Sequence, residues 1–246
     1  MNVLTALHKQ HTDLLRRVGR CLSFGCSTQQ TLHAAALTSR LTLAWPEAYL
    51  SAEGYSHNPK HNGPPHSAEL IGQEAVAAVG QFSSHALLKD VLRGLGDFTV
   101  SKQEVRVDVL PGVKIPTPSN SGLISVSRLG RSTVERLYDP STPNIPSSSS
   151  ASKNLINVHS AILSASQKPV AIVSQVLRVE GTKGSGDLYS FAASKPAALG
   201  AFLRELEERS LRSKKELTAL EQAVRDLETE TWDREDAVED MGSAKS

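Results

Sequence analysis

The amino-acid sequence predicts an α+β protein with an N-terminal all-helical bundle, a flexible linker and a C-terminal three-stranded antiparallel sheet followed by a long helix. Three observations predict this class. Apolar residues recur at helical spacing in the first 96 residues, a Ser/Pro-rich stretch occupies 139–153, and alternating apolar residues then precede a long heptad pattern.

Composition limits the function classes. The chain has 246 residues, of which 39% are hydrophobic and 4% aromatic, so its core must consist of Leu, Val, Ile and Ala. The formal net charge of +1 gives no reason to expect nucleic acid or an anionic membrane as a partner. No apolar run approaches the roughly 20 residues of a membrane-spanning helix. Two cysteines exclude a disulfide scaffold and favour a reducing compartment.

The predicted helical domain spans residues 1–96. Pro46 is expected to stop or kink the second helix, and 53–65 is a loop by composition. Four segments have apolar residues at helical spacing; these are 2–23, 29–44, 68–79 and 84–95.

The first of these helices allows two interpretations. It has an apolar face, four basic residues and one acid, so it packs on a neighbouring helix or serves as a mitochondrial presequence. We favour the packing helix.

Residues 97–153 are predicted to be an irregular connection. Within it, Glu104–Leu110 alternates like a strand, and 121–138 favours a strand with a helical turn. Residues 139–153 have almost nothing to bury, which predicts a flexible linker.

The C-terminal module, 154–230, has the clearest pattern. Strands are predicted at Leu155–Ser164, Val170–Val179 and Asp187–Ala193, and the second strand is apolar on both faces. A helix from Ser194 to Leu227 follows four heptads and would be about 50 Å long. Its second half exceeds the sheet and must pack elsewhere in the protein or in a partner. An acidic tail, 231–246, is predicted to be disordered.

Few residues suggest chemistry. His8, His11, Cys21 and Cys26 are metal-ligand types, but their spacing is not a strong zinc pattern, so structural roles are expected. A loop with three histidines (His57, His61 and His66) could bind a metal ion weakly, although an exposed polar loop explains it as well. The glycine-rich segment 181–187 joins two predicted strands and lacks the features of a phosphate-binding loop. We therefore expect no catalytic residues, no metal and no cofactor.

The residues from Leu155 to Leu206 resemble the COMM-domain family. The match comprises Leu-Ile-Asn-Val-His at 155–159, a proline-led second strand at Pro169–Val179, a third strand at Leu188–Ala193 and a helix containing Leu199, Phe202, Leu203 and Leu206. The resemblance implies a non-enzymatic cytoplasmic adaptor, associated with endosomes, that pairs with related chains into hetero-oligomers serving the recycling of membrane cargo. Links to copper handling and ubiquitin-dependent regulation also belong to that family.

An isolated sheet of three short strands is marginally stable, so the two-sided strand predicts a protein partner. That the partner is a related chain in a hetero-oligomer is what the resemblance implies. The expected interface residues are apolar positions of the strands and the long helix: Val170, Ile172, Val176, Tyr189, Phe191, Phe202, Leu206, Leu217, Leu220 and Val224. Two alternatives remain, an accessory subunit of a mitochondrial complex and a metal-dependent protein that uses the His/Cys residues.

Overall fold

The computed structural model describes residues 3–23, 27–56, 72–92, 98–115, 123–138, 154–181, 192–193 and 197–232. These residues form an α+β fold, as predicted. The helices are α1 (Val3–Ser23), α2 (Thr28–Leu43), α3 (Trp45–Ala52), α4 (Gln73–Val91), α5 (Arg131–Tyr138) and α7 (Ala197–Trp232). The strands are β1 (Phe98–Val109), β2 (Leu123–Leu129), β3 (Leu155–Ser164) and β4 (Pro169–Gly181).

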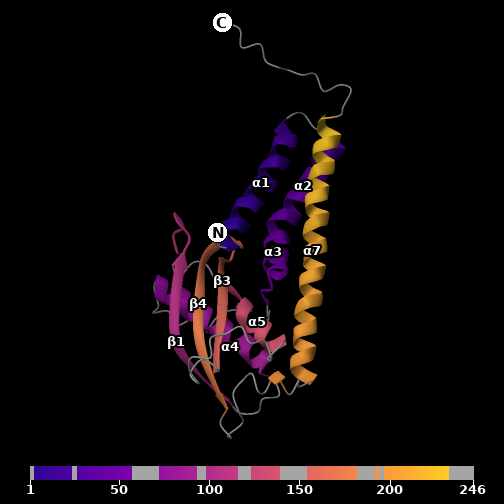
Figure 1. Ribbon diagram of the computed structural model, residues 1–246. Coiled ribbons are helices and arrows are strands. Elements are labelled where there is room, and N and C mark those ends of the chain that lie inside the picture. Colours follow the sequence, from indigo (N-terminus) through magenta and orange to yellow (C-terminus); the bar gives the residue numbers. More distant parts are fainter. Residues whose placement is uncertain are drawn as a thin grey trace.

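The sheet has four antiparallel strands in the order β1-β4-β3-β2, which corrects the predicted three-stranded sheet (Figure 1). β1 pairs with β4 from Phe98 to Val109, so the strand on this side of β4 comes from a segment that precedes β3 in the chain. Of the third predicted strand, Asp187–Ala193, residues 187–191 lie outside the described residues, and Ala192–Ala193 form a helical turn. Both neighbours of β4 are therefore known, and β1 and β2 come from the segment expected to be an irregular connection.

One helix, α4, covers one face of the sheet where the sequence predicted two separate helices. Gly80 lies in its interior, against Val173 of β4. The absence of a side chain lets the helix approach the strands closely, so this glycine does not end the helix. Leu87, Leu88 and Val91 are buried between α4 and the sheet, as the predicted apolar stripe requires.

A buried layer of serines joins α4 to β2 and β3. The Ser160 hydroxyl donates to the Gly80 carbonyl at 3.1 Å and lies 3.0 Å from the Ser84 hydroxyl and 2.6 Å from that of Ser127. Since buried hydroxyls are costly without partners, this network orients α4 on the sheet as well as stabilising the contact.

The N-terminal helices confirm the predicted helical segments. α1 buries Leu4, Leu7, Leu14 and Val18. Ser27 caps α2 in a capping box with Gln30. Pro46 lies in the first turn of α3, where its missing N–H needs no partner, so α2 ends before it and a new helix begins.

The long helix α7 spans 36 residues and joins the sheet to the N-terminal helices (Figure 1). Its first turns bury Leu199 and Leu203 in the core with β3, β4 and α4. Its second half packs against α1, α2 and α3, where Leu220 and Leu227 are fully buried. The part of α7 that exceeds the sheet is thus covered within the chain.

Two contacts show how α7 runs relative to α2 and α3. The Gln30 side-chain amide donates to the Glu230 carbonyl at 3.0 Å, and the Ser210 hydroxyl donates to the Ala52 carbonyl at 2.8 Å. The α2–α3 segment therefore lies antiparallel to α7.

Candidate protein interface

Of the His and Cys residues that are metal-ligand types, those that the structure describes do not gather at one place. His11 stacks on Trp45 with ring centroids 5.6 Å apart, and its Nε2 lies 2.9 Å from the Leu41 carbonyl oxygen. Cys21 is buried in the apolar core. Cys26 and the histidines at 57, 61 and 66 lie outside the described residues. Within the ranges that the structure describes, no three His, Cys, Asp or Glu residues are grouped to hold a metal ion.

The predicted interface residues have several environments. Val170, Ile172, Leu220 and Val224 are at most 8% exposed and belong to the chain's own core. Partly exposed positions remain at Val176, Phe202, Leu206 and Leu217. Tyr189 and Phe191 fall outside the described residues. The chain itself covers four of these positions, so any contact of the folded protein with a partner must use surfaces that remain exposed.

One such surface lies on the face of the sheet that α4 does not cover, toward the C-terminal end of β4. Pairing in the sheet places one polar residue of each strand in a row across this face: Arg128 of β2, His159 of β3, Ser174 of β4 and Arg106 of β1. We call these residues the polar row. In the neighbouring row, Val176 lies between Glu104 and Asn157. Each residue in both rows is partly or fully exposed.

The polar row is held by contacts of its own. His159 Nδ1 lies 3.1 Å from the Ser174 hydroxyl. Arg128 lies over the Tyr55 ring at 4.9 Å and donates to the Glu53 carbonyl at 2.9 Å. Burial, together with the charge of Arg128, lowers the pKa of His159, so the imidazole is neutral at neutral pH.

A serine beside a neutral histidine has the composition of a nucleophile and its base, yet a second group normally orients the histidine. Among the described residues no carboxylate bonds to His159, and the space beside its Nε2 is bordered by Gly130. We therefore interpret the pair as a cross-strand contact on a candidate binding surface.

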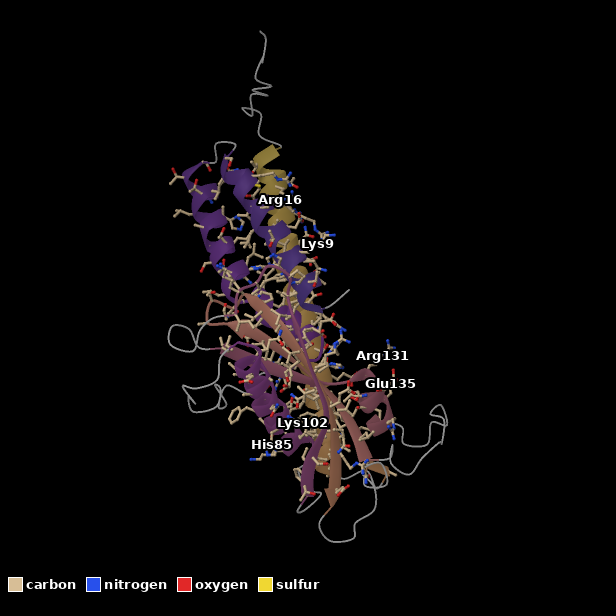
Figure 2. The ribbon with its side chains drawn as sticks, turned by 90° about the vertical axis from the view of Figure 1, so that its left-hand side faces the viewer. Lys9, Arg16, His85, Lys102, Arg131 and Glu135 are labelled. Atoms are coloured by element: carbon tan, nitrogen blue, oxygen red, sulfur yellow. The ribbon has the colours of Figure 1, made fainter. Side chains whose placement is uncertain are left out.

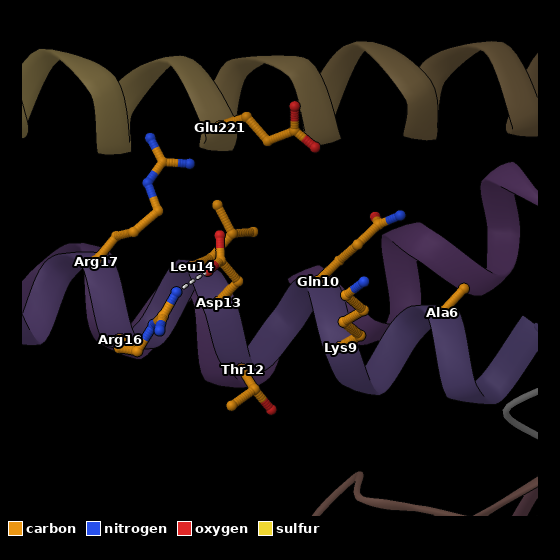
Figure 3. Close-up of a pocket in the computed structure, with 9 residues that line it drawn as sticks. All are labelled: Ala6, Lys9, Gln10, Thr12, Asp13, Leu14, Arg16, Arg17 and Glu221. Carbon is orange, nitrogen blue, oxygen red and sulfur yellow. Dashed lines mark hydrogen bonds and ion pairs between the residues drawn. The ribbon is translucent and has the colours of Figure 1, made fainter.

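A second surface is a groove between α1 and α7 (Figure 3). It encloses about 720 Å³, and α1 supplies all of its lining except Glu221. The lining comprises Ala6, Lys9, Gln10, Thr12, Asp13, Leu14, Arg16, Arg17 and Glu221. We call it the α1/α7 groove.

Most charges of the α1/α7 groove are already paired. Asp13 accepts a 2.7 Å hydrogen bond from Arg16, and Glu221 lies 3.7 Å from Arg225. Arg17 forms two hydrogen bonds with Glu228, at 2.8 and 2.5 Å. Among the described residues, Lys9 is the charged residue of the lining without an ion pair. We consider the groove a candidate binding surface.

The outward side of α1 is basic. Lys9, Arg16 and Arg20 follow one another at helical spacing with Asp13 between them, and the three cations are exposed. Figure 2 shows Lys9 and Arg16 on the helical end of the molecule, away from Arg131 and Glu135 of α5. We call Lys9, Asp13, Arg16 and Arg20 the basic stripe; its net formal charge is +2 (three cations minus one acid).

The Arg17–Glu228 pair should make stability depend on pH. The hydrogen bond from Arg17 lowers the pKa of Glu228 below its ordinary value of 4.5. A depressed carboxyl pKa stabilises the fold above 4.5, and this contribution is lost as pH falls through the lowered folded-state pKa. We expect Glu228→Gln to lower the free energy of unfolding by about 1 kcal/mol at neutral pH.

Urea unfolding at successively lower pH measures this effect. The difference between wild type and Glu228→Gln should vanish once the wild-type carboxyl is protonated. Glu208→Gln, at an exposed position of the same helix, should match wild type throughout. A constant difference at all pH values would show that the ion pair is not its source.

Comparison of the chain with models of known protein families, with curated proteins and with solved structures finds no match. Within the described residues, none of the helices is both long and apolar enough to cross a membrane.

Sequence reasoning found the alternation of Glu104–Leu110 but neither surface. The polar row depends on the register of four strands, and the groove depends on α1 lying beside a helix some 200 residues later. Only the spacing of the basic residues on α1 indicated a candidate surface from the sequence.

Proposed function

We propose that this protein is a non-enzymatic adaptor that holds partner proteins at two separate surfaces, the α1/α7 groove and the polar row with Val176. The observation that carries this proposal is α7, one 36-residue helix that packs on the sheet at its start and beside α1 at its end. At 1.5 Å per residue it extends about 54 Å. A continuous helix anchored at both ends keeps the two surfaces at a fixed separation.

The basic stripe defines the chemistry of the partner at the helical end. Two helices side by side offer a groove that accommodates a third helix. The net charge of +2 favours acidic side chains on that helix, and electrostatic attraction chiefly raises the association rate and the specificity. We propose an acidic helical segment of another protein as the ligand.

The proposal is tested with the full chain and its purified partner. Partners that co-purify in stoichiometric amounts are identified, and binding is then reconstituted from pure components. Lys9→Glu combined with Arg16→Glu should raise the dissociation constant about tenfold or more, because attraction becomes repulsion. Lys89→Glu with Arg131→Glu makes the same charge change on α4 and α5 and should leave binding unchanged.

Val176→Lys probes the second surface, since its side chain lies on the uncovered half of the sheet. It should abolish binding of one partner and leave the partner of the basic stripe bound. A partner whose affinity is unaffected by changes at either surface, or the lack of any stoichiometric partner, would refute the adaptor role at these surfaces.

The narrower role implied by the COMM-domain resemblance is endosomal recycling, and the alternative is a mitochondrial complex. The burial of Leu4, Leu7, Leu14 and Val18 supports a retained α1, because cleavage of a presequence would remove these residues from the core. Imaging of the tagged protein separates the two locations.

A further inference from the structure

β1 is an edge strand of the sheet, and its outer side pairs with no other described strand. Figure 2 looks onto the side of the molecule that carries this edge, where Lys102 is labelled. The ladder between β1 and β4 is regular from Glu104 to Val109 and shifts register between Lys102 and Glu104. Edge strands offer unpaired backbone groups to another strand unless something prevents it.

The backbone groups that face outward can be assigned. The Leu110 N–H donates to the Val170 carbonyl at 3.0 Å, and residues of an antiparallel strand alternate between facing one neighbour and facing the other. Glu104, Arg106 and Asp108 therefore bond to β4. The N–H and C=O groups of Val105, Val107 and Val109 point away from the sheet.

Side chains alternate in the same segment. Val105, Val107 and Val109 are partly exposed and pack beside the core under α4. Arg106 and Asp108 lie on the opposite face, and their side chains are 72% and 39% exposed. Among the ion pairs of the described residues, these two side chains pair only with each other, at 2.9 Å. From Val105 to Val109 the edge thus presents an apolar face and a face with one charge of each sign.

The sequence Val-Arg-Val-Asp-Val is self-complementary about Val107. If a second copy lies antiparallel with Val107 opposite Val107, then Val105 faces Val109, and Arg106 faces Asp108 of the second copy. The directly opposed valines are those whose backbone groups point outward, so each of these pairs can exchange two hydrogen bonds. The whole ladder lies in the regular part of β1.

Neighbouring registers are less favourable. A centre on Arg106 or on Asp108 places like charges opposite each other, which is destabilising. A centre on Val105 would extend the ladder through the irregularity between Lys102 and Glu104. Charges on edge strands often prevent pairing, but here their order makes one two-fold arrangement attractive.

We propose that two copies of this chain associate through β1, with Glu104–Leu110 of each forming an antiparallel ladder about a two-fold axis at Val107. The two sheets become one sheet of eight strands. It ends at β2 on both sides, where the Ser56 N–H bonds to the Ser127 carbonyl at 2.8 Å and occupies part of that edge. Two-fold pairing is closed, so the product is a dimer.

Charge exchange tests the register with the full-length protein. In sedimentation velocity over a range of concentrations, wild type should show a monomer–dimer equilibrium. Arg106→Asp and Asp108→Arg each place like charges opposite one another twice, and each should raise the dissociation constant about tenfold or more. The double variant Arg106→Asp/Asp108→Arg restores both opposed pairs and should dimerise like wild type.

Mixing the two single variants provides the sharpest control. Arg106→Asp has two acids where Asp108→Arg has two cations, so the mixture should form heterodimers although neither variant dimerises alone. Circular dichroism should show all variants folded, because the Arg106 and Asp108 side chains are 72% and 39% exposed and their ion pair joins them to each other. Lys9→Glu/Arg16→Glu should leave the dimer intact, which separates this inference from the proposed binding at the basic stripe.

A wild-type chain that stays monomeric at high micromolar concentration would overturn the inference. So would a dimer that tolerates both single variants, since it must use another surface. Failure of the double variant to restore dimerisation would exclude the proposed register.

Discussion

Leu220→Ala is expected to lower the free energy of unfolding by about 3–5 kcal/mol, the largest effect of any change considered for this protein. Leu220 is fully buried where the second half of α7 meets the N-terminal helices. Its removal loses the transfer free energy of the side chain and leaves a cavity that α1, α2 and α7 fill only in part.

Denaturant unfolding monitored by circular dichroism measures the loss. Leu211→Ala, in the same helix at 53% exposure, is the matched control and should change stability by less than about 0.5 kcal/mol. If Leu220→Ala were as mild as the control, α7 would not pack on the N-terminal helices in solution. The two surfaces of the proposed adaptor would then lack their rigid connection.

Gly80→Ala is expected to destabilise the protein by about 1–3 kcal/mol, even though alanine favours helices. A Cβ atom at position 80 would lie 2.8 Å from Cβ and Cγ2 of Val173, in the centre of the sheet. α4 must then move away from β4. The move also lengthens the hydrogen bond from Ser160 to the Gly80 carbonyl.

The control is Gly200→Ala in α7, where a Cβ atom meets nothing within 4 Å. Since no steric contact opposes the higher helix propensity of alanine there, the substitution should raise the free energy of unfolding by up to about 1 kcal/mol. Opposite signs for the two substitutions in one unfolding assay would establish close packing of α4. A stabilising Gly80→Ala would show that α4 lies farther from the sheet.

Much of the local structure could be predicted because its causes are local. The 3.6-residue spacing in α1 arises from Leu4, Leu7, Leu14 and Val18, which occupy one face of any helix formed there. Alternation at Leu155–Ser164 and Val170–Val179 likewise marks β3 and β4. For the candidate surfaces, the sequence revealed only the charges of the basic stripe and of β1.

The partners of these elements could not be predicted in the same way. Glycine normally weakens a helix, yet Gly80 lies inside α4 because Val173 of β4 leaves no room for a side chain there. The apolar stripe of α7 fits a second protein as well as it fits α1 and α2. Likewise, β4 is apolar on both faces whatever covers them.

The sequence alone therefore determined most of α1, α2, β3, β4 and α7, their apolar faces and the charge order on β1. Only the tertiary structure decided that β1 lies beside β4, that α1 and α2 cover the end of α7, and that the polar row crosses the sheet. Periodicity depends on neighbours a few residues apart, whereas pairing depends on contacts such as Arg17 with Glu228, 211 residues away. Their free energy depends on the geometry of the whole fold, which no local pattern contains.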